Sequence, residues 1–105
     1  MEITFKKEYL QELYETGKTT EKRYRFQPYI VAKYRKTIDI LEAVSGIEDL
    51  YKFNSLCYEE LLGNKKGISS VRINDQYRIE FIVNQVISET VITVCNIIEL
   101  SNHYK

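Results

Sequence analysis

The sequence predicts an α+β domain in which an N-terminal helical pair packs on an antiparallel β-sheet. In the first half of the chain, apolar residues recur at the three- and four-residue spacing of helices. From Ser69 onward they alternate with polar residues, which is the period of strands. Helices that come first and strands that follow favour segregated layers over an alternating α/β arrangement. At 105 residues the chain is expected to form one domain over residues 1–105, with a modest core.

Two helices are predicted before the sheet. Residues 7–16 form the first, and Gly17 is its C-terminal stop; its apolar face consists of Leu10, Leu13 and Tyr14. The second begins at Pro28, which a first helical turn tolerates, and runs to about Val44. Residues 47–53 are expected to add one or two further helical turns. The apolar face of the second helix consists of Ile30, Tyr34, Ile38 and Leu41.

Four segments are predicted as strands. Residues 2–6 alternate weakly and indicate a short strand. Residues 69–73 and 77–83 alternate clearly on either side of the turn signal Asn-Asp-Gln, which predicts a hairpin. Residues 90–98, TVITVCNII, are almost continuously apolar, so we expect a strand that is buried on both faces.

The apolar pattern of the hairpin selects its register. A three-residue loop at 74–76 pairs Val71 with Ile79 and keeps the apolar side chains on one face, whereas a two-residue loop mixes the faces. The same register makes Arg72 and Arg78 direct cross-strand neighbours on the open face of the sheet, with Cβ atoms about 5 Å apart. Like charges so placed repel each other, and we expect Glu80, diagonal to Arg72, to offset part of that repulsion.

The arginine pair has two interpretations. In one, the pair and Glu80 form a surface charge ladder with no ligand. In the other, the pair is a preformed anion site, because guanidinium forks match phosphate oxygens bidentately. Replacing Arg78 is then expected to cost little folding stability, since its side chain is predicted to face outward.

The C-terminal residues are predicted to lie near this pair. A strand over 90–98 that runs antiparallel beside 77–83 returns the chain end toward Arg78. Histidine has the side-chain pKa best suited to proton transfer near neutral pH, although a single tail histidine is often incidental. The connection before the sheet, with Asn54 and Tyr58, is expected to form a wall of the cleft beside the arginine pair. Cys57 in this connection is expected to be a small buried hydrophobe rather than a nucleophile. The tail residues delivered to the cleft are Asn102, His103, Tyr104 and Lys105.

A strongly basic stretch lies in an otherwise neutral chain. Formal net charge is zero over the whole sequence, but residues 18–36 hold seven basic residues against Glu21 alone, a local charge of +6. Such a patch contacts phosphates even in a neutral protein, and we expect it to be the surface that meets ribosomal RNA if the chain has an RNA target. A solvated helix face is the alternative. The basic residues are Lys18, Lys22, Arg23, Arg25, Lys33, Arg35 and Lys36.

Several classes of protein are disfavoured by composition. No apolar run approaches the roughly 18 residues that a membrane span needs. The first residues lack the layout of a signal peptide, so a cytoplasmic protein is expected. Two cysteines fit reduced thiols better than a disulfide framework. One histidine and no C-x-x-C pair argue against structural zinc, and no cofactor is expected.

Residues 61–67, LLGNKKG, followed by residues 70–79, SVRINDQYRI, resemble a known family core. HigB-type toxins of the RelE/ParE superfamily, the plasmid maintenance system killer proteins, commonly have L-K-G, a short basic turn and G. They continue with S-[IV]-R-[IV]-N-D-Q-[WY]-R-[IV]. The resemblance covers about the last half of the chain, and the run from Arg72 to Arg78 is its most specific part.

The resemblance implies a RelE-like fold, compact and similar to microbial ribonucleases. It also implies a ribosome-dependent mRNA endoribonuclease that uses no metal and cleaves by attack of a ribose 2′-OH on the adjacent phosphate. The partners that the resemblance implies for the toxin are the ribosome with its mRNA and a HigA-like antitoxin with a helix-turn-helix domain. The toxin is then expected to contact DNA only indirectly, through that antitoxin. The implied catalytic residues are Arg72, Arg78, His103 and Tyr104, and the implied RNA contacts are Tyr77, Lys65, Lys66, Asn54 and Lys105.

Three departures from the family pattern keep alternatives open. Leu62 stands where L-K-G has lysine, and Asn64 replaces an acid that is frequent in the following turn. Many relatives have a histidine in the connection 54–60, where this chain offers Asn54 and Cys57. A catalytically weak or degenerate toxin that acts by binding antitoxin or ribosome is therefore one alternative. A small anion-binding protein with no RNA role is another.

Overall fold

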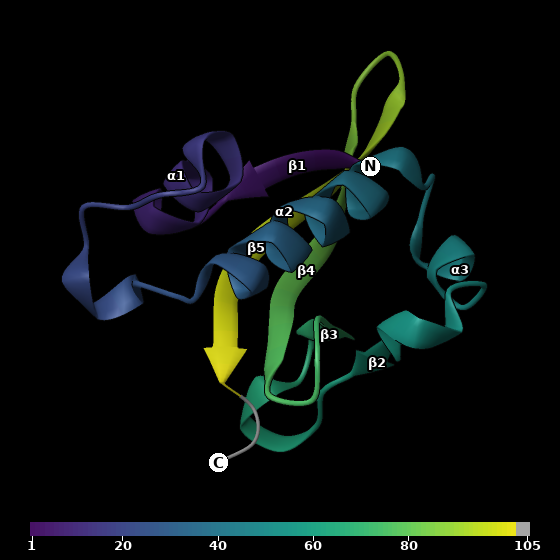
Figure 1. Cartoon of the computed structure of the whole chain (residues 1–105). Helices are drawn as coiled ribbons and strands as arrows, with labels where there is room; N and C mark the ends of the chain where they lie inside the picture. The colour runs from purple at the N-terminus through teal and green to yellow at the C-terminus, as the bar shows by residue number, and fades with distance from the viewer. Residues whose placement is uncertain (103–105) are drawn as a thin grey trace.

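Helices precede the main strands along the chain, as the change of period at Ser69 predicts. The computed structural model describes residues 1–102. Three helices, α1 (Glu8–Thr16), α2 (Pro28–Ala43) and α3 (Ile47–Leu50), come before the long strands (Figure 1). Short 3₁₀ turns η1 (Lys22–Tyr24), η2 (Asn54–Leu56) and η3 (Gly63–Lys65) interrupt the connections. The strands are β1 (Glu2–Phe5), β2 (Glu59–Glu60), β3 (Ser69–Arg72), β4 (Tyr77–Ile87) and β5 (Val91–Asn102).

The five strands form one sheet in the order β1-β5-β4-β3-β2. The pairs β5–β4 and β4–β3 are antiparallel, as predicted. The short strand β2, which the sequence did not predict, pairs antiparallel with β3. β1 pairs in parallel with β5, so the sheet is mixed at that edge. α1 and α2 cover one face of the sheet, and the connection from α3 leads to β2 at the edge of the sheet beyond β3 (Figure 1). The predicted α+β architecture is therefore confirmed.

The helical layer forms where the apolar spacing predicts it. Gly17 ends α1 in the left-handed conformation (φ +78°), where a side chain is strained, and its N–H donates to the Leu13 carbonyl. Pro28 begins α2. On α1, Tyr9 is buried in place of the predicted Tyr14, which is half-buried. The four predicted core residues of α2, Ile30, Tyr34, Ile38 and Leu41, are all buried.

The far end of the β4–β5 hairpin differs from the prediction. The segment 90–98 was expected to be buried on both faces, but Val91 and Ile92 are exposed. β1 pairs with β5 only from Val94 to Ile97, and β3 pairs with β4 only as far as Phe81. Beyond these residues the two strands continue as an isolated ribbon past the helices (Figure 1). Continuous apolarity here reflects a projecting ribbon, not burial on both sides.

None of the helices in residues 1–102 combines the length and apolar character required to cross a lipid bilayer.

A buried hydrogen bond between the two long helices contributes to stability. The Tyr34 hydroxyl donates to the Leu10 carbonyl at 2.7 Å inside the core. We expect Tyr34→Phe to lower the free energy of unfolding by about 1–2 kcal/mol, because the bond is lost with little change in packing. Tyr14→Phe is the matched control: it removes an exposed bond to Asp39, and its loss should stay below about 0.5 kcal/mol. Urea unfolding of the two variants measures the difference, and equal losses would contradict the assignment.

Candidate functional site

The β3–β4 hairpin places two arginines directly opposite each other. The register pairs Val71 with Ile79 and Arg72 with Arg78. The Ile73 N–H donates to the Tyr77 carbonyl at 3.0 Å, which closes a three-residue loop. The predicted loop length and cross-strand arginine pair are both confirmed.

The loop itself is held by the side chain of Asn74. Its Oδ1 accepts hydrogen bonds from the backbone N–H groups of Gln76 (2.9 Å) and Tyr77 (2.7 Å). Asparagine favours turns because its side chain satisfies backbone donors two or three residues further on. This local interaction fixes where β4 begins, and with it the alignment of the arginines.

The arginines line an open pocket on the side of the sheet away from the helices. Val71 and Ile79 are fully buried in the core, so their neighbours Arg72 and Arg78 point to the other face. The pocket has a volume of about 570 Å³, and Cys57 and Asp75 complete its lining.

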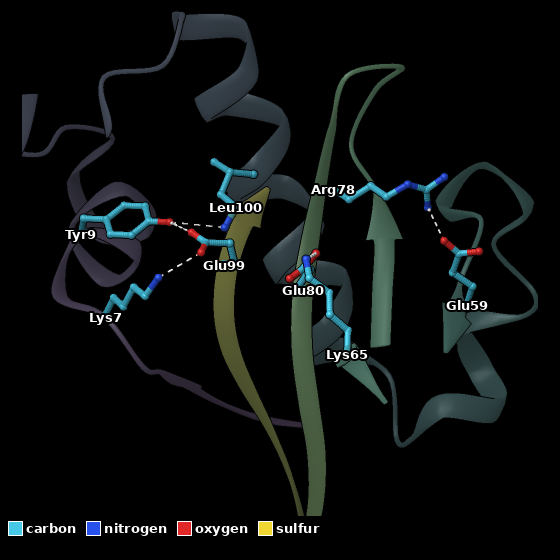
Figure 2. A network of polar contacts seen from close by, with 8 residues as sticks. All are labelled: Lys7, Tyr9, Glu59, Lys65, Arg78, Glu80, Glu99 and Leu100. Carbon is cyan, nitrogen blue, oxygen red and sulfur yellow. Dashed lines mark hydrogen bonds and ion pairs between the residues drawn. The ribbon is translucent and has the colours of Figure 1, made fainter. Parts of the chain in front are cut away.

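Arg78 is buried, contrary to the prediction that it faces outward on an open surface. It is 8% exposed. Its Nη1 donates to the Cys57 carbonyl at 3.5 Å and lies 3.7 Å from Glu59 Oε1 (Figure 2). β2 adds a further strand beyond β3, and this addition brings Glu59 over the guanidinium. Replacing Arg78 by a small residue is therefore expected to cost stability as well as function.

Arg72 has a different environment. Its side chain is 37% exposed, and Nη2 forms an ion pair with Asp75 Oδ1 in the hairpin loop. The Asp75 side chain is 96% exposed, so this pair is screened by solvent and contributes little to stability. Each arginine thus has its own carboxylate, Asp75 for Arg72 and Glu59 for Arg78.

Glu80 does not offset the arginine charge as the sequence predicted. It is buried, and Lys65 Nζ lies 2.8 Å from its Oε2 (Figure 2). Glu80 also lies directly opposite Glu99 in the β4–β5 register, where two carboxylates repel. Two lysines compensate that repulsion: Lys65 pairs with Glu80, and Lys7 Nζ lies 3.0 Å from Glu99 Oε2.

Glu99 has a second partner in the helical layer. It accepts a hydrogen bond from the Tyr9 hydroxyl at 2.7 Å, and the Leu100 N–H donates to the same hydroxyl oxygen (Figure 2). Burial and the bond to Glu99 raise the pKa of Tyr9, which therefore stays protonated and remains a donor. This contact ties α1 to the strand that runs beside Arg78.

The remaining predicted site residues do not all gather at the arginine pocket. Lys66 and Asn54 are exposed. Tyr77 lies on the helix-facing side of the sheet, where its ring meets Phe26 edge-on with centroids 5.4 Å apart. β5 places Asn102 opposite Tyr77, so the chain does return to this end of the sheet, as predicted. His103, Tyr104 and Lys105 lie outside the described residues.

Cys57 is exposed, which corrects the prediction that it is a small buried hydrophobe. It ends η2 in the left-handed conformation (φ +46°), uncommon for a residue other than glycine. The preceding Leu56 occupies the core instead. Sequence reasoning also missed Asp75 and Glu59 as partners of the arginines. The spacing of three between Arg72 and Asp75 was a usable signal for one of them, whereas nothing local connects Glu59 to Arg78.

Residues 1–102 contain no cluster of three or more His, Cys, Asp or Glu side chains arranged to hold a metal ion. The cationic side chains that line the pocket are the guanidinium groups of Arg72 and Arg78. The pocket presents two guanidinium groups with several N–H donors, each beside a carboxylate, next to a wall formed by Cys57.

The family model described as "RelE-like toxin of type II toxin-antitoxin system HigB" matches residues 3–94. The chain belongs to this family of HigB-like toxins. Toxin HigB-1 of Vibrio cholerae serotype O1 (strain ATCC 39315 / El Tor Inaba N16961) is 37% identical to it over 83 residues. That alignment covers 77% of this chain and 82% of the Vibrio toxin. Membership in a type II toxin–antitoxin family implies a cognate antitoxin as partner.

The HigB-like chain also shares its fold with a solved toxin structure. A YoeB/ParE toxin from Agrobacterium tumefaciens superposes with a TM-score of 0.57 over 99% of this chain and all of the other. The two sequences are 18% identical, so this similarity concerns the fold alone. It agrees with the architecture of helices packed on a five-stranded sheet.

The two cysteines of the toxin should differ sharply in reactivity. Cys95 is fully buried in β5, and burial raises the pKa of its thiol to about 12, so the reactive thiolate is scarce near neutral pH. Cys57 is exposed at the pocket. At pH 7.5 we expect a maleimide to label Cys57 quickly and Cys95 only after the chain is unfolded in denaturant. Mass spectrometry of the intact protein counts the labels. In the Cys57→Ser variant the fast labelling should disappear; rapid modification of two thiols in the native wild type would show that the β5 core opens.

Proposed function

We propose that this HigB-like toxin is a ribosome-dependent endoribonuclease that cleaves mRNA without a metal ion, by attack of a ribose 2′-OH on the adjacent phosphate. The observation that carries the proposal is the pair Arg72 and Arg78, held directly opposite each other in one pocket. Two guanidinium groups so arranged match the oxygens of one phosphate.

The arginines supply charge stabilisation in this mechanism. As the 2′-oxygen bonds to phosphorus and the bond to the 5′-oxygen of the next nucleotide breaks, negative charge grows on the non-bridging phosphate oxygens. Donors that are already in position stabilise that charge without reorganising at the moment of reaction. Arg78 meets this requirement because it is buried between the Cys57 carbonyl and Glu59.

Phosphate binding requires a change at Arg72. In the resting chain Asp75 occupies that guanidinium, through an exposed ion pair of a kind that contributes at most about 1 kcal/mol. A phosphate that bridges both arginines gains two charge-assisted contacts and therefore displaces Asp75 at small cost. Glu59 is half-exposed and sits at the rim of Arg78, where it keeps the buried charge compensated until substrate arrives.

Proton transfer is assigned to the C-terminal residues. His103 is proposed to move the protons, with Tyr104 as a second candidate, because Asn102 already lies beside the start of β4. Base stacking is assigned to Tyr104 as well, since the Tyr77 ring packs against Phe26 on the other face. Lys66, Asn54 and Lys105 are proposed to contact the RNA backbone.

Dependence on the ribosome fits such a sparse set of groups. A ribosome holds mRNA in a fixed path and supplies the positioning that a small enzyme cannot provide alone. The proposal therefore places the activity in the cytoplasm. The partner that restrains it is proposed to be a HigA-like antitoxin with a helix-turn-helix domain, through which the toxin meets DNA only indirectly.

A degenerate toxin that binds antitoxin or ribosome but cuts poorly is the second candidate. It is favoured by one observation: the pocket is lined by Cys57 where many relatives have a histidine in the connection. The L-K-G lysine is also replaced by Leu62, whose side chain is exposed and cannot donate a proton. Under this alternative, the arginine pair binds RNA without turnover.

Substitution of the arginines tests the ribonuclease. Arg72→Ala should lower the rate of mRNA cleavage on programmed ribosomes about 30- to 1000-fold, the effect of losing one transition-state donor worth roughly 2–4 kcal/mol. Arg78→Lys keeps the buried charge but removes the fork, and we expect a similar loss with a smaller change in stability than a truncation. Lys6→Ala, between β1 and α1, is the control, because that exposed cation lies neither in the pocket nor in the basic stretch 18–36. Full activity in an Arg72→Ala/Arg78→Lys double variant would refute the mechanism.

Expression in cells separates the two candidates. Induction of the chain without its neighbouring antitoxin gene should arrest growth and create new mRNA 5′ ends within coding regions. Co-expression of the antitoxin should abolish both effects, and the Arg72→Ala variant should produce neither. Growth arrest by the wild type with no new 5′ ends would favour the degenerate toxin.

A further inference from the structure

A second concavity lies in the helical layer, between the end of α1, the connection 18–27 and α2. Its volume is about 520 Å³. Leu13, Val31 and Phe26 form its floor, and Lys18, Arg25 and Arg35 stand around it. It coincides with part of the basic stretch 18–36, which the sequence predicts to meet ribosomal RNA. The structure adds an apolar floor that charge counting cannot detect.

The floor is a fixed apolar surface. Leu13 and Val31 are buried side chains of the core, so their accessible atoms at the groove are backed by packed neighbours. Phe26 is half-buried and held by its edge-on contact with Tyr77. Covering an apolar surface of this kind with other apolar atoms lowers the free energy. The side chains of the floor offer no hydrogen bond to a phosphate or a base.

The rim of the groove carries positive charge. Lys18, Arg25 and Arg35 are all exposed, and the described residues that line the groove include no acidic side chain. None of the ion pairs within residues 1–102 involves these three. Arg35 is held in place by the carbonyls of Tyr14 (2.9 Å) and Glu15 (3.4 Å), which it caps at the end of α1. The groove therefore has a fixed apolar floor and a cationic rim.

These features favour a protein partner over RNA. Single-stranded RNA binds by phosphate contacts and by stacking of bases on open aromatic faces. The aromatic residue at this rim, Tyr24, already stacks on Tyr9 with ring centroids 3.7 Å apart and has the Arg23 guanidinium 5.4 Å from its centre. An amphipathic peptide segment with acidic side chains matches both the floor and the rim.

We propose that this groove binds an acidic, amphipathic segment of the cognate antitoxin. Its apolar side chains cover Leu13, Val31 and Phe26, and its carboxylates meet Lys18 and Arg25. A helix lying along the groove presents such side chains at positions i, i+3 and i+4. The proposal rests on the toxin–antitoxin family, which implies an antitoxin, and is independent of whether the chain cleaves RNA.

The groove and the arginine pocket lie on opposite faces of the sheet. Tyr77 contacts Phe26 on the helix side, and the next residue along β4, Arg78, lines the pocket on the other side. A segment seated in the groove therefore does not touch Arg72 or Arg78. Affinity for the antitoxin and binding of phosphate are separable properties of the chain.

Filling the groove tests the proposal. Ala32 is exposed on α2 and lines the groove, so Ala32→Trp obstructs it while every charge is kept. Ala43→Trp, at the exposed last residue of α2, is the matched control. The binding probes are the purified antitoxin encoded by the neighbouring gene and purified ribosomes. We expect Ala32→Trp to weaken antitoxin binding at least tenfold relative to Ala43→Trp, with ribosome affinity unchanged within twofold.

A charge variant gives an independent measurement. Arg25→Glu on the exposed rim should weaken antitoxin binding and reduce its dependence on salt, and Arg72→Ala should leave antitoxin affinity unchanged. Thermal unfolding of each variant verifies folding, and Arg25→Glu decides the matter if Ala32→Trp does not fold. Antitoxin affinity of Ala32→Trp equal to that of Ala43→Trp would overturn the proposal. Loss of ribosome binding by Arg25→Glu with intact antitoxin binding would assign the surface to RNA instead. A chain that cleaves nothing leaves these binding results valid.

Discussion

The side chain of Asn74 holds the three-residue turn on which the geometry of the toxin depends. By accepting hydrogen bonds from the N–H groups of Gln76 and Tyr77, it sets the residue at which β4 begins. Because strand side chains alternate between faces, a slip of one residue would move the core residues out and the arginines in. This short-range interaction, together with the apolar alternation of the strands, thus fixes both what the core contains and that Arg72 meets Arg78.

Burial of Arg78 links stability to the proposed chemistry. A cation removed from water must be compensated, and here the Cys57 carbonyl and Glu59 do so from a segment that is distant in sequence. The same contacts hold the guanidinium in one orientation, which is the condition for stabilising charge in a transition state. Arg72 is partly exposed and paired with the exposed carboxylate of Asp75, so its guanidinium can exchange that partner for a phosphate at small cost.

The sheet separates two recognition surfaces. On its outer side the arginine pocket presents charge and N–H donors, whereas the helical side presents a groove with an apolar floor. These surfaces suit ligands of different chemistry, a phosphate and an amphipathic peptide. The contact between Phe26 and Tyr77 brings the groove close to the strand that carries Arg78, although the two sites remain on opposite faces.

Periodicity and turn chemistry by themselves determined the helices, the hairpin register and the pairing of Arg72 with Arg78, because each depends on residues near in sequence. Only the tertiary structure decided the environment of those arginines. Glu59 lies beside Arg78, and Lys65 forms an ion pair with Glu80. Both contacts follow from the path of the connection between α3 and β3, which no local sequence pattern encodes. Solvent exposure is likewise a property of what packs nearby: Val91 and Ile92, at the start of the apolar run 90–98, lie on a projecting ribbon, whereas Cys95 and Ile97 are buried.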